Sequence, residues 1–400
     1  MVTIAALEHL HAGAGWRNYH YLKMTTTDGV VGWAEYEESL RSPGATSVID
    51  TLKPHVIGKP VDDIERLTTR LSTLTRAAAG SSVSMAIGAI ENAALDTKAR
   101  TLGIPVYSLL GGKVRDSIRV YWSHCATWRI SLPQWYGNEI NHIEQVVDLG
   151  AEVRESGFTA LKTNIFNYDD AGVPHGWFPG FGQPDDPGLN VERSVLRNIT
   201  RHLEALREGA GPDVDLLLDI NFNARTEGLL RIVKELADLD MFWLEIDHDS
   251  PEALARVREA SGNAISGGET LFGSKGFLPY FQAGALDVGI IDTIWNGTWQ
   301  SMKMAAVAAA FEVNVAPHNY YGHLCTYMSA HFCAAVPNLR IMETDIDRIP
   351  WDDELVTHPP VYVDGHLILS DRPGWGTEPN EEAIAAHPPV EAGDLISMRK

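Results

Sequence analysis

The hydrophobic pattern of the first part of the chain is that of a mixed α+β layer. Alternating apolar and polar residues predict three strands, at Thr3–His9, Tyr19–Thr26 and Val30–Glu37. The turn signal TTDG lies between the second and third strands, which favours a small antiparallel meander. Apolar residues at helical spacing then predict three helices, around Thr46–Leu52, Val61–Thr75 and Ser81–Leu102.

From about Ile118 onward, short apolar runs alternate with amphipathic helical segments, which is typical of βαβ units. Six of these runs end in an acid or a histidine, at Asp219, Glu245, Glu269, Asp292, His318 and Glu343. The successive intervals are 26, 24, 23, 26 and 25 residues, about the length of a strand, a helix and two loops. With the earlier runs GFTALKTN and SIRVYWSH there are eight strands, and the pattern predicts a TIM-type (β/α) barrel.

Composition excludes several classes of protein. The chain has 400 residues, 44% of them hydrophobic, which suits two domains or one large barrel with an appendage. A net charge of −21 argues against nucleic acid as a partner. Three cysteines without CxxC spacing argue against a disulfide framework. We also see no signal peptide, and the most apolar stretch, Met304–Ala316, is too short to cross a bilayer, so a cytoplasmic protein without membrane contact is expected.

Asp219, Glu245 and Glu269 end three consecutive predicted strands, so they should be neighbours at the mouth of the barrel. Three converging carboxylates repel one another unless a cation lies between them. Hard oxygen ligands suit Mg²⁺, and the sequence therefore predicts a magnesium site. The alternative is that individual acids pair with surface lysines or arginines.

The next two strands end in Asp292 and His318, a pair that can act as a general base or acid because the carboxylate orients the ring. His323 is a second, less well placed candidate. On the last strand, Glu343 could hydrogen-bond the developing oxyanion, or it could pair with Arg340 or Arg348.

Lys162 stands in the apolar run TALKTNIFN, where a charge is costly without a partner. We expect it near the end of the second barrel strand, facing the mouth, where it would neutralise an anionic substrate or enolate. The alternative is a lysine paired with a barrel carboxylate for structure alone. Asn164, two residues on, faces the same way but cannot exchange a proton.

Several linked motifs resemble the enolase superfamily, and more narrowly its mandelate racemase branch. They are TTDGVVGWAEY, AIENAALDTKARTLGIPVYSLLGG, the three strand-end acids, and RPGWGTEPNEEA near the end. The resemblance implies an N-terminal α+β capping domain over residues 1–115, a catalytic barrel over 116–345, and a segment, 346–400, that returns to the cap.

The resemblance also implies roles for single residues. Asp219, Glu245 and Glu269 match the Mg²⁺ ligands, and Asn221 matches an asparagine often found two residues after the first ligand. Asp292 and His318 match the family's dyad, within APHNYYGHL, which is similar to the PHxxxxG motif of sugar-acid dehydratases. Glu343 and Lys162 match the last-strand acid and the first lysine of a Lys-x-Lys motif.

The cap and loops should determine specificity. Trp16, Arg17 and Tyr19 fall in a family loop that closes over the mouth, and Arg17 could pair with a distal carboxylate or hydroxyl. The long segment 167–188 is expected to be a lid or an oligomer contact, and Arg129 is expected to face the site with His124. The full set of candidate substrate-binding residues is Asn164, Asn221, Arg17, Trp16, Tyr19, His124, Asn319 and His323.

The sequence departs from the family in two places. Asn164 replaces the second lysine, which is the base of the racemase on that face, so racemisation loses one of its two bases. LEIDHD stands where many members have Glu-Glu-Pro, which leaves Asp247 and His248 without a counterpart.

These features favour an Mg²⁺-dependent dehydratase of a small-molecule sugar acid, an aldonate or an aldarate, in a homo-oligomer. A racemase, epimerase or cycloisomerase is the alternative and would need Asp247, His248 or His124 as a second base. A sugar-acid binding protein without turnover is a third possibility.

Overall fold

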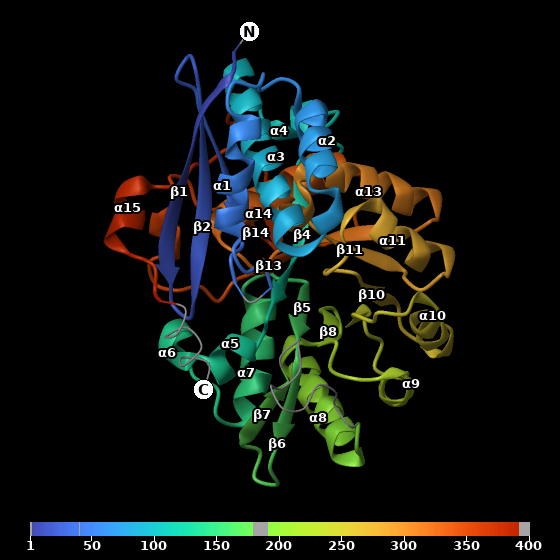
Figure 1. The fold of residues 1–400 in the computed structure, drawn as a ribbon. Helices are drawn as coiled ribbons and strands as arrows, with labels where there is room; N and C mark the ends of the chain where they lie inside the picture. The colour runs from blue at the N-terminus through green and yellow to red at the C-terminus, as the bar shows by residue number, and fades with distance from the viewer. Residues whose placement is uncertain (1, 40, 179–190, 392–400) are drawn as a thin grey trace.

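Eight parallel strands form the barrel, which confirms the fold class that the strand ends predict. They are β4 (Ser117–Ser123), β5 (Ala160–Thr163), β8 (Asp215–Asn221), β9 (Trp243–Ile246), β10 (Ile265–Gly267), β11 (Val288–Asp292), β12 (Asn314–His318) and β13 (Met342–Asp345). Each pairs with the next from β4 to β12, and β13 pairs with β4. A bridge between Val315 and Leu339 links β12 to the segment before β13. The structure, a computed structural model, describes residues 2–39, 41–178 and 191–391 (Figure 1).

Alternation along each strand separates the inside of the barrel from its helical coat. On β5, Ala160 packs with Tyr121 and Trp243 in the barrel interior, whereas Leu161 packs outward. The outer core is closed by helices that pack on the sheet, and the last of them is buried along its whole length. These are α7 (Ile143–Glu155), α8 (Arg193–Ala210), α9 (Thr226–Glu235), α10 (Pro251–Ala260), α11 (Gly273–Gln282), α13 (Thr298–Ala310) and α14 (His323–Ala335).

The cap consists of an antiparallel meander packed on helices (Figure 1). Its strands are β1 (Ile4–Ala14), β2 (Arg17–Thr26) and β3 (Val31–Tyr36), and its main helices are α1 (Ala45–Val56), α2 (Ile64–Leu74) and α3 (Ser81–Leu102). The predicted helix over 81–102 has the observed bounds. The first strand runs five residues beyond the predicted end at His9, because residues 9–14 pair with 17–22 across a tight turn.

Buried carboxylates of the cap hold the barrel helices by their first turns. Glu35 on β3 accepts hydrogen bonds from the backbone N–H groups of Gly322 and Cys325, at the start of α14. Glu91 on α3 does the same for Trp299 and Gln300 in α13. The free N–H groups and positive end of a helix dipole stabilise an acceptor there.

A third buried carboxylate, Asp96 on α3, joins the beginning of the chain to its end. It accepts hydrogen bonds from the backbone N–H groups of Trp33 and Trp375, both at 2.8 Å, and from Arg100 Nε at 2.9 Å. The short helix α15 (Glu381–Ala386) then lies beside β1 (Figure 1).

One expectation changes in detail. The start of the long segment 167–188 is not an irregular loop, because β6 (Ile165–Tyr168) and β7 (Pro174–Phe178) form an antiparallel hairpin; residues 179–188 lie outside the described residues. The three cysteines, Cys125, Cys325 and Cys333, are free and buried. Within the described ranges, none of the helices has the length and apolar character to span a bilayer.

Candidate active site

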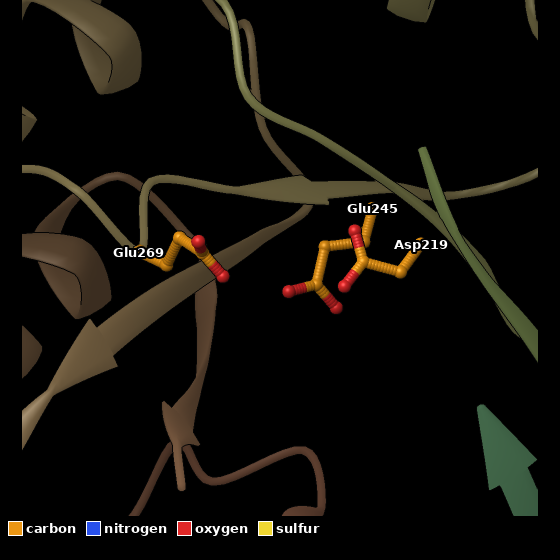
Figure 2. A group of neighbouring side chains, drawn as sticks. All are labelled: Asp219, Glu245 and Glu269. Carbon is orange, nitrogen blue, oxygen red and sulfur yellow. The ribbon is translucent and has the colours of Figure 1, made fainter. Parts of the chain in front are cut away.

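Three carboxylates from consecutive strands converge at the C-terminal end of the barrel (Figure 2). Asp219 and Glu245 lie on β8 and β9, and one oxygen of each lies within 4.8 Å of the other and of an oxygen of Glu269. Glu269 does not end its strand as the sequence predicts, because β10 stops at Gly267. Gly268, with φ of 105°, turns the chain so that the acid still points into the mouth.

The three acids fit a divalent cation. All are at least 96% buried, and the Oε1 atoms of Glu245 and Glu269 are buried without a hydrogen-bond donor in the described part of the chain. Burial raises the pKa of Glu245 well above its usual value and raises that of Asp219 as well. A cation with oxygen ligands removes both penalties, since it satisfies the orphaned oxygens and offsets the repulsion.

Lys162 lies at the centre of the acidic cluster. Its Nζ atom is 3.0 Å from Glu245 Oε2, 3.0 Å from Glu343 Oε1 and 3.4 Å from Asp219 Oδ2. Burial alone would lower the pKa of Lys162, but these carboxylates raise it well above its usual value. The side chain is therefore a fixed cation in the mouth, above the barrel interior.

Asp292 and His318 form a hydrogen-bonded pair, with 2.6 Å between Oδ2 and Nδ1. The other oxygen of Asp292 accepts the backbone N–H groups of Ile294 and Trp295, and Tyr321 donates to Oδ2 at 2.8 Å. Four donors hold this carboxylate in a single orientation, which fixes the imidazole with Nε2 toward Glu269 at 3.4 Å.

The same acids determine the protonation of His318. Burial would lower its pKa, but Glu269 and Asp292 raise the pKa of His318 to about 10. A cation bound by Glu269 would offset that carboxylate's charge and so favour the neutral ring that a base requires.

Glu343 pairs with Lys162 and not with Arg340 or Arg348. Ser123 donates to its Oε1 at 2.5 Å, and the backbone N–H of Asn319 donates to Oε2 at 2.7 Å. The amide of Asn319 donates to the carbonyl oxygen of Glu343 and to Thr326, so it supports the strand end.

Two asparagines flank the acids. Thr127 donates to Asn164 Oδ1 at 2.8 Å, which leaves the amide N–H₂ of Asn164 as the group available to a ligand. Asn221 adopts φ of 49°, its N–H binds Asp219, and its buried Oδ1 has no donor in the described residues.

Asp247 and His248, which have no family counterpart, diverge. Asp247 is buried, accepts the backbone N–H of Gly268 at 3.0 Å, and so holds the turn before Glu269. His248 bonds to Thr226 and to the backbone N–H of Ser250, outside the acidic cluster.

On the cap side, Arg17 donates to the carbonyl oxygen of Tyr320 and to Tyr19, and lies 3.6 Å from Asp345 Oδ2. His124 binds the other oxygen of Asp345 and stacks on Trp128. Trp16 donates to Tyr136 and packs on Trp128.

Two candidates point elsewhere. His323 pairs with Asp353 at 2.7 Å, and Arg129 pairs with Glu152 and Asp347. Sequence reasoning missed Tyr321, Ser123 and Thr127; of these, Tyr321 lies in APHNYYGHL, next to the pair it supports.

Comparison with known families agrees with this geometry. Residues 145–383 match the family described as Enolase C-terminal domain-like. Residues 12–111 match the N-terminal domain of the mandelate racemase and muconate lactonizing enzymes. The chain belongs to the enolase superfamily, in its mandelate racemase branch.

Relatives within the superfamily carry different names. A D-galactonate dehydratase family member from Streptomyces bingchenggensis is 30% identical, over 100% of this chain and 96% of the relative. D-galactarolactone cycloisomerase from Agrobacterium fabrum is 26% identical, over 92% and 91%. A crystal structure from Burkholderia xenovorans LB400, provisionally named L-alanine-DL-glutamate epimerase and bound to magnesium and fumarate, is 57% identical with a TM-score of 0.96, over 98% of both chains.

Proposed function

We propose that the protein is an Mg²⁺-dependent sugar-acid dehydratase. It would remove the proton next to the carboxylate, eliminate the 3-hydroxyl as water and release a 2-keto-3-deoxy acid. The proposal draws on the dehydratase name of the Streptomyces relative and the magnesium in the Burkholderia structure. The observation that carries it is the contrast between two positions: His318 is supported as a base by Asp292, whereas Asn164 places an amide where the racemase of the family has its second base.

The acidic cluster would bind the substrate's reacting end. Asp219, Glu245 and Glu269 would hold Mg²⁺, which supplies positive charge to the carboxylate as negative charge develops on its oxygens. Lys162, held by three carboxylates, would add a second fixed cation on the same side. Its ion pairs with Glu245 and Glu343 suit an electrostatic role, and we assign the role of base to His318.

His318 would carry the proton transfers. Its Nε2 would take the 2-proton while Asp292 holds Nδ1–H, giving an enediolate and a protonated ring. The same Nε2–H would then protonate the departing 3-hydroxyl, so that the C3–O bond breaks and water leaves. The resulting enol takes a proton at C3 and becomes the 2-keto-3-deoxy acid.

The isomer-forming alternative rests on the name of the Burkholderia protein. It needs a base on the second face of the substrate. Asp247 accepts the backbone N–H of Gly268, and His248 is bound to Thr226 and Ser250 outside the acidic cluster. His124 binds Asp345 through Nδ1, as His318 binds Asp292, so His124 is the candidate for that base. The dehydratase is favoured because Asn164 places an amide where the racemase of the family has its second base.

Turnover in deuterium oxide separates the two reactions. Aldonic and aldaric acids would be incubated with the protein and Mg²⁺, and products would be analysed by proton NMR. We expect a 2-keto-3-deoxy acid with solvent deuterium at C3, and recovered substrate with its original configuration at C2. Formation of the C2 epimer without any keto acid would establish the epimerase instead.

A further inference from the structure

On the cap side of the mouth, two side chains that form an ion pair each have a buried polar atom without a hydrogen-bond partner in the described residues. Arg17 Nε and Asp345 Oδ2 each have no hydrogen-bond partner among the described residues. They belong to side chains that already approach each other, because Arg17 Nη2 lies 3.6 Å from Asp345 Oδ2. Unsatisfied buried polar atoms are costly, so a pair of opposite character indicates a site for a ligand group.

The remaining contacts of both side chains fix them in place. The guanidinium of Arg17 lies over the rings of Trp16, Tyr19 and Tyr320 at 5.0, 5.3 and 5.0 Å, and its Nη1 donates to the carbonyl oxygen of Tyr320. Asp345 Oδ1 binds His124 Nδ1 at 2.8 Å. The orphaned atoms are therefore the positions left for a ligand on a rigid pair.

Strand β13 determines how far the Arg17–Asp345 pair lies from the reacting end of the substrate. Asp345 lies two residues beyond Glu343 on β13, on the same side and nearer the cap. Two residues of a strand advance about 6.6 Å. The spacing between Glu343 and Asp345 is comparable to the length of an extended pentonic or hexonic acid. A substrate whose carboxylate lies beside the metal and Lys162 would therefore place its far end near Asp345.

The charge of the pair decides what it can accept. Arg17 is compensated by Asp345, so the two together carry no net charge. A second substrate carboxylate could accept from Arg17 Nε but would meet the like charge of Asp345, and like charges in a desolvated site strongly disfavour binding. A hydroxyl group can accept from an N–H and donate to a carboxylate oxygen, so its chemistry matches both Arg17 Nε and Asp345 Oδ2.

We infer that Arg17 and Asp345 form a distal subsite for a neutral hydroxyl, and that the substrate is an aldonate and not an aldarate. This inference rests on the proposed function for the sugar-acid nature of the substrate. What it adds to the proposed function is the chemical group at the substrate's distal end, a hydroxyl.

The test compares acids that differ only at the far end. D-galactonate with galactarate, D-gluconate with D-glucarate and D-xylonate with xylarate would be assayed for keto-acid formation. Binding to the Mg²⁺-loaded protein would be measured by calorimetry in parallel. We expect at least one aldonate to exceed its matching aldarate by about tenfold or more, in kcat/KM and in affinity, because a site built for a hydroxyl rejects a group that leaves its polar atoms unpaired.

Asp345→Asn tests the charge argument directly. It removes the like charge, so the aldarate should gain relative to the aldonate by about tenfold. Arg17→Gln removes the charged donor and should weaken the aldonate without favouring the aldarate. Asp50→Asn makes the same charge change on the exposed cap surface, where Asp50 contacts His9, and should leave the preference as it was. If Asp345→Asn does not fold, the wild-type comparison and Arg17→Gln still decide.

The two proposals fail in different ways. Epimerisation with a retained aldonate preference would overturn the dehydratase and keep the distal subsite. Keto-acid formation with an aldarate preferred would keep the dehydratase and overturn the subsite. Absence of binding by every acid in the panel would overturn both.

Discussion

The Nζ atom of Lys162 on β5 lies 3.0 Å from Oε2 of Glu245 on β9, although β8 separates the two strands. The contact explains why a lysine stands in an apolar run. Lys162 shares its strand face with Ala160, which packs in the barrel interior, so its side chain emerges at the mouth among the acids. The charge is buried, but its partners are buried with it.

Lys162→Met should abolish nearly all turnover, whereas Lys162→Arg should retain some. Methionine leaves Glu245 and Glu343 without their shared cation, which should also lower the free energy of unfolding without Mg²⁺ by about 3 kcal/mol. Turnover and urea unfolding would be measured on both variants. Exchange of the 2-proton with solvent that survives His318→Asn but disappears in Lys162→Met would reverse the roles proposed for the two residues.

Glu245→Gln and Glu269→Gln should each abolish metal-dependent turnover while leaving the fold intact. In the wild type, Mg²⁺ should raise the melting temperature with increasing concentration, because it binds only the folded cluster. The two variants should lose this shift, and Glu259→Gln, on an exposed part of α10, should keep it. Equal activity before and after chelation and dialysis would contradict the metal assignment.

Asp247 should support the metal site through the turn that carries Glu269. Asp247→Ala removes the acceptor for Gly268 N–H and should weaken Mg²⁺ binding about tenfold, whereas Asp247→Asn retains an acceptor oxygen and should bind nearly as tightly as the wild type. Calorimetric Mg²⁺ titration measures this without reference to activity. Equal losses in both variants would show that the charge of Asp247 matters, and not its hydrogen bond.

His318→Asn should stop turnover, with a loss of at least about 10²-fold. Asp292→Asn should be nearly as damaging for a specific reason. The amide oxygen is needed by Ile294 and Trp295, so the amide N–H₂ would face His318 Nδ1 and force the proton onto Nε2. Tyr321→Phe removes only one of the two donors to Oδ2, and a milder decrease in kcat is expected. Full activity of Asp292→Asn would exclude the pair from catalysis.

The buried Glu91 should make stability depend on pH. Burial raises the pKa of Glu91 to about 7 from 4.5, although Gln300 and Lys303 favour its ionised form. Its stabilising contribution is therefore present below about pH 4.5 and lost as pH rises to about 7. Glu91→Gln keeps an acceptor for Trp299, so its stability relative to the wild type should rise across this window by about 3 kcal/mol. Parallel unfolding curves at pH 5 and pH 8, with a constant difference between the proteins, would contradict this.

The barrel was predictable because polar residues follow apolar runs at nearly equal intervals along the sequence. Each strand that ends at the mouth carries a polar residue after an apolar run, and Asp219, Asp292 and His318 lie within the predicted strands. Glu269 is the exception, since two glycines end β10 early and turn the acid inward.

The supporting contacts were not predictable, because they join residues far apart in sequence. Ser123 meets Glu343 across 220 residues, and Arg17 meets Asp345 across the cap and barrel. The extension of β1 to Ala14 was missed for a local reason, since HAGAGW has the small residues of a loop although it pairs as a strand. The domain boundaries and the roles of individual site residues remain predictions.

Asp96 binds Trp33 and Trp375, and this has a consequence for synthesis on the ribosome. The cap is translated before the barrel, but its central helix, α3, makes a hydrogen bond to a backbone group that emerges only after the barrel has been made. Until then, Oδ1 of Asp96 lacks the hydrogen bond from Trp375, and the cap lacks the C-terminal segment that packs on it. The cap is therefore translated before the barrel but completed after it, and truncation before Trp375 would damage the cap as well as the segment that is lost.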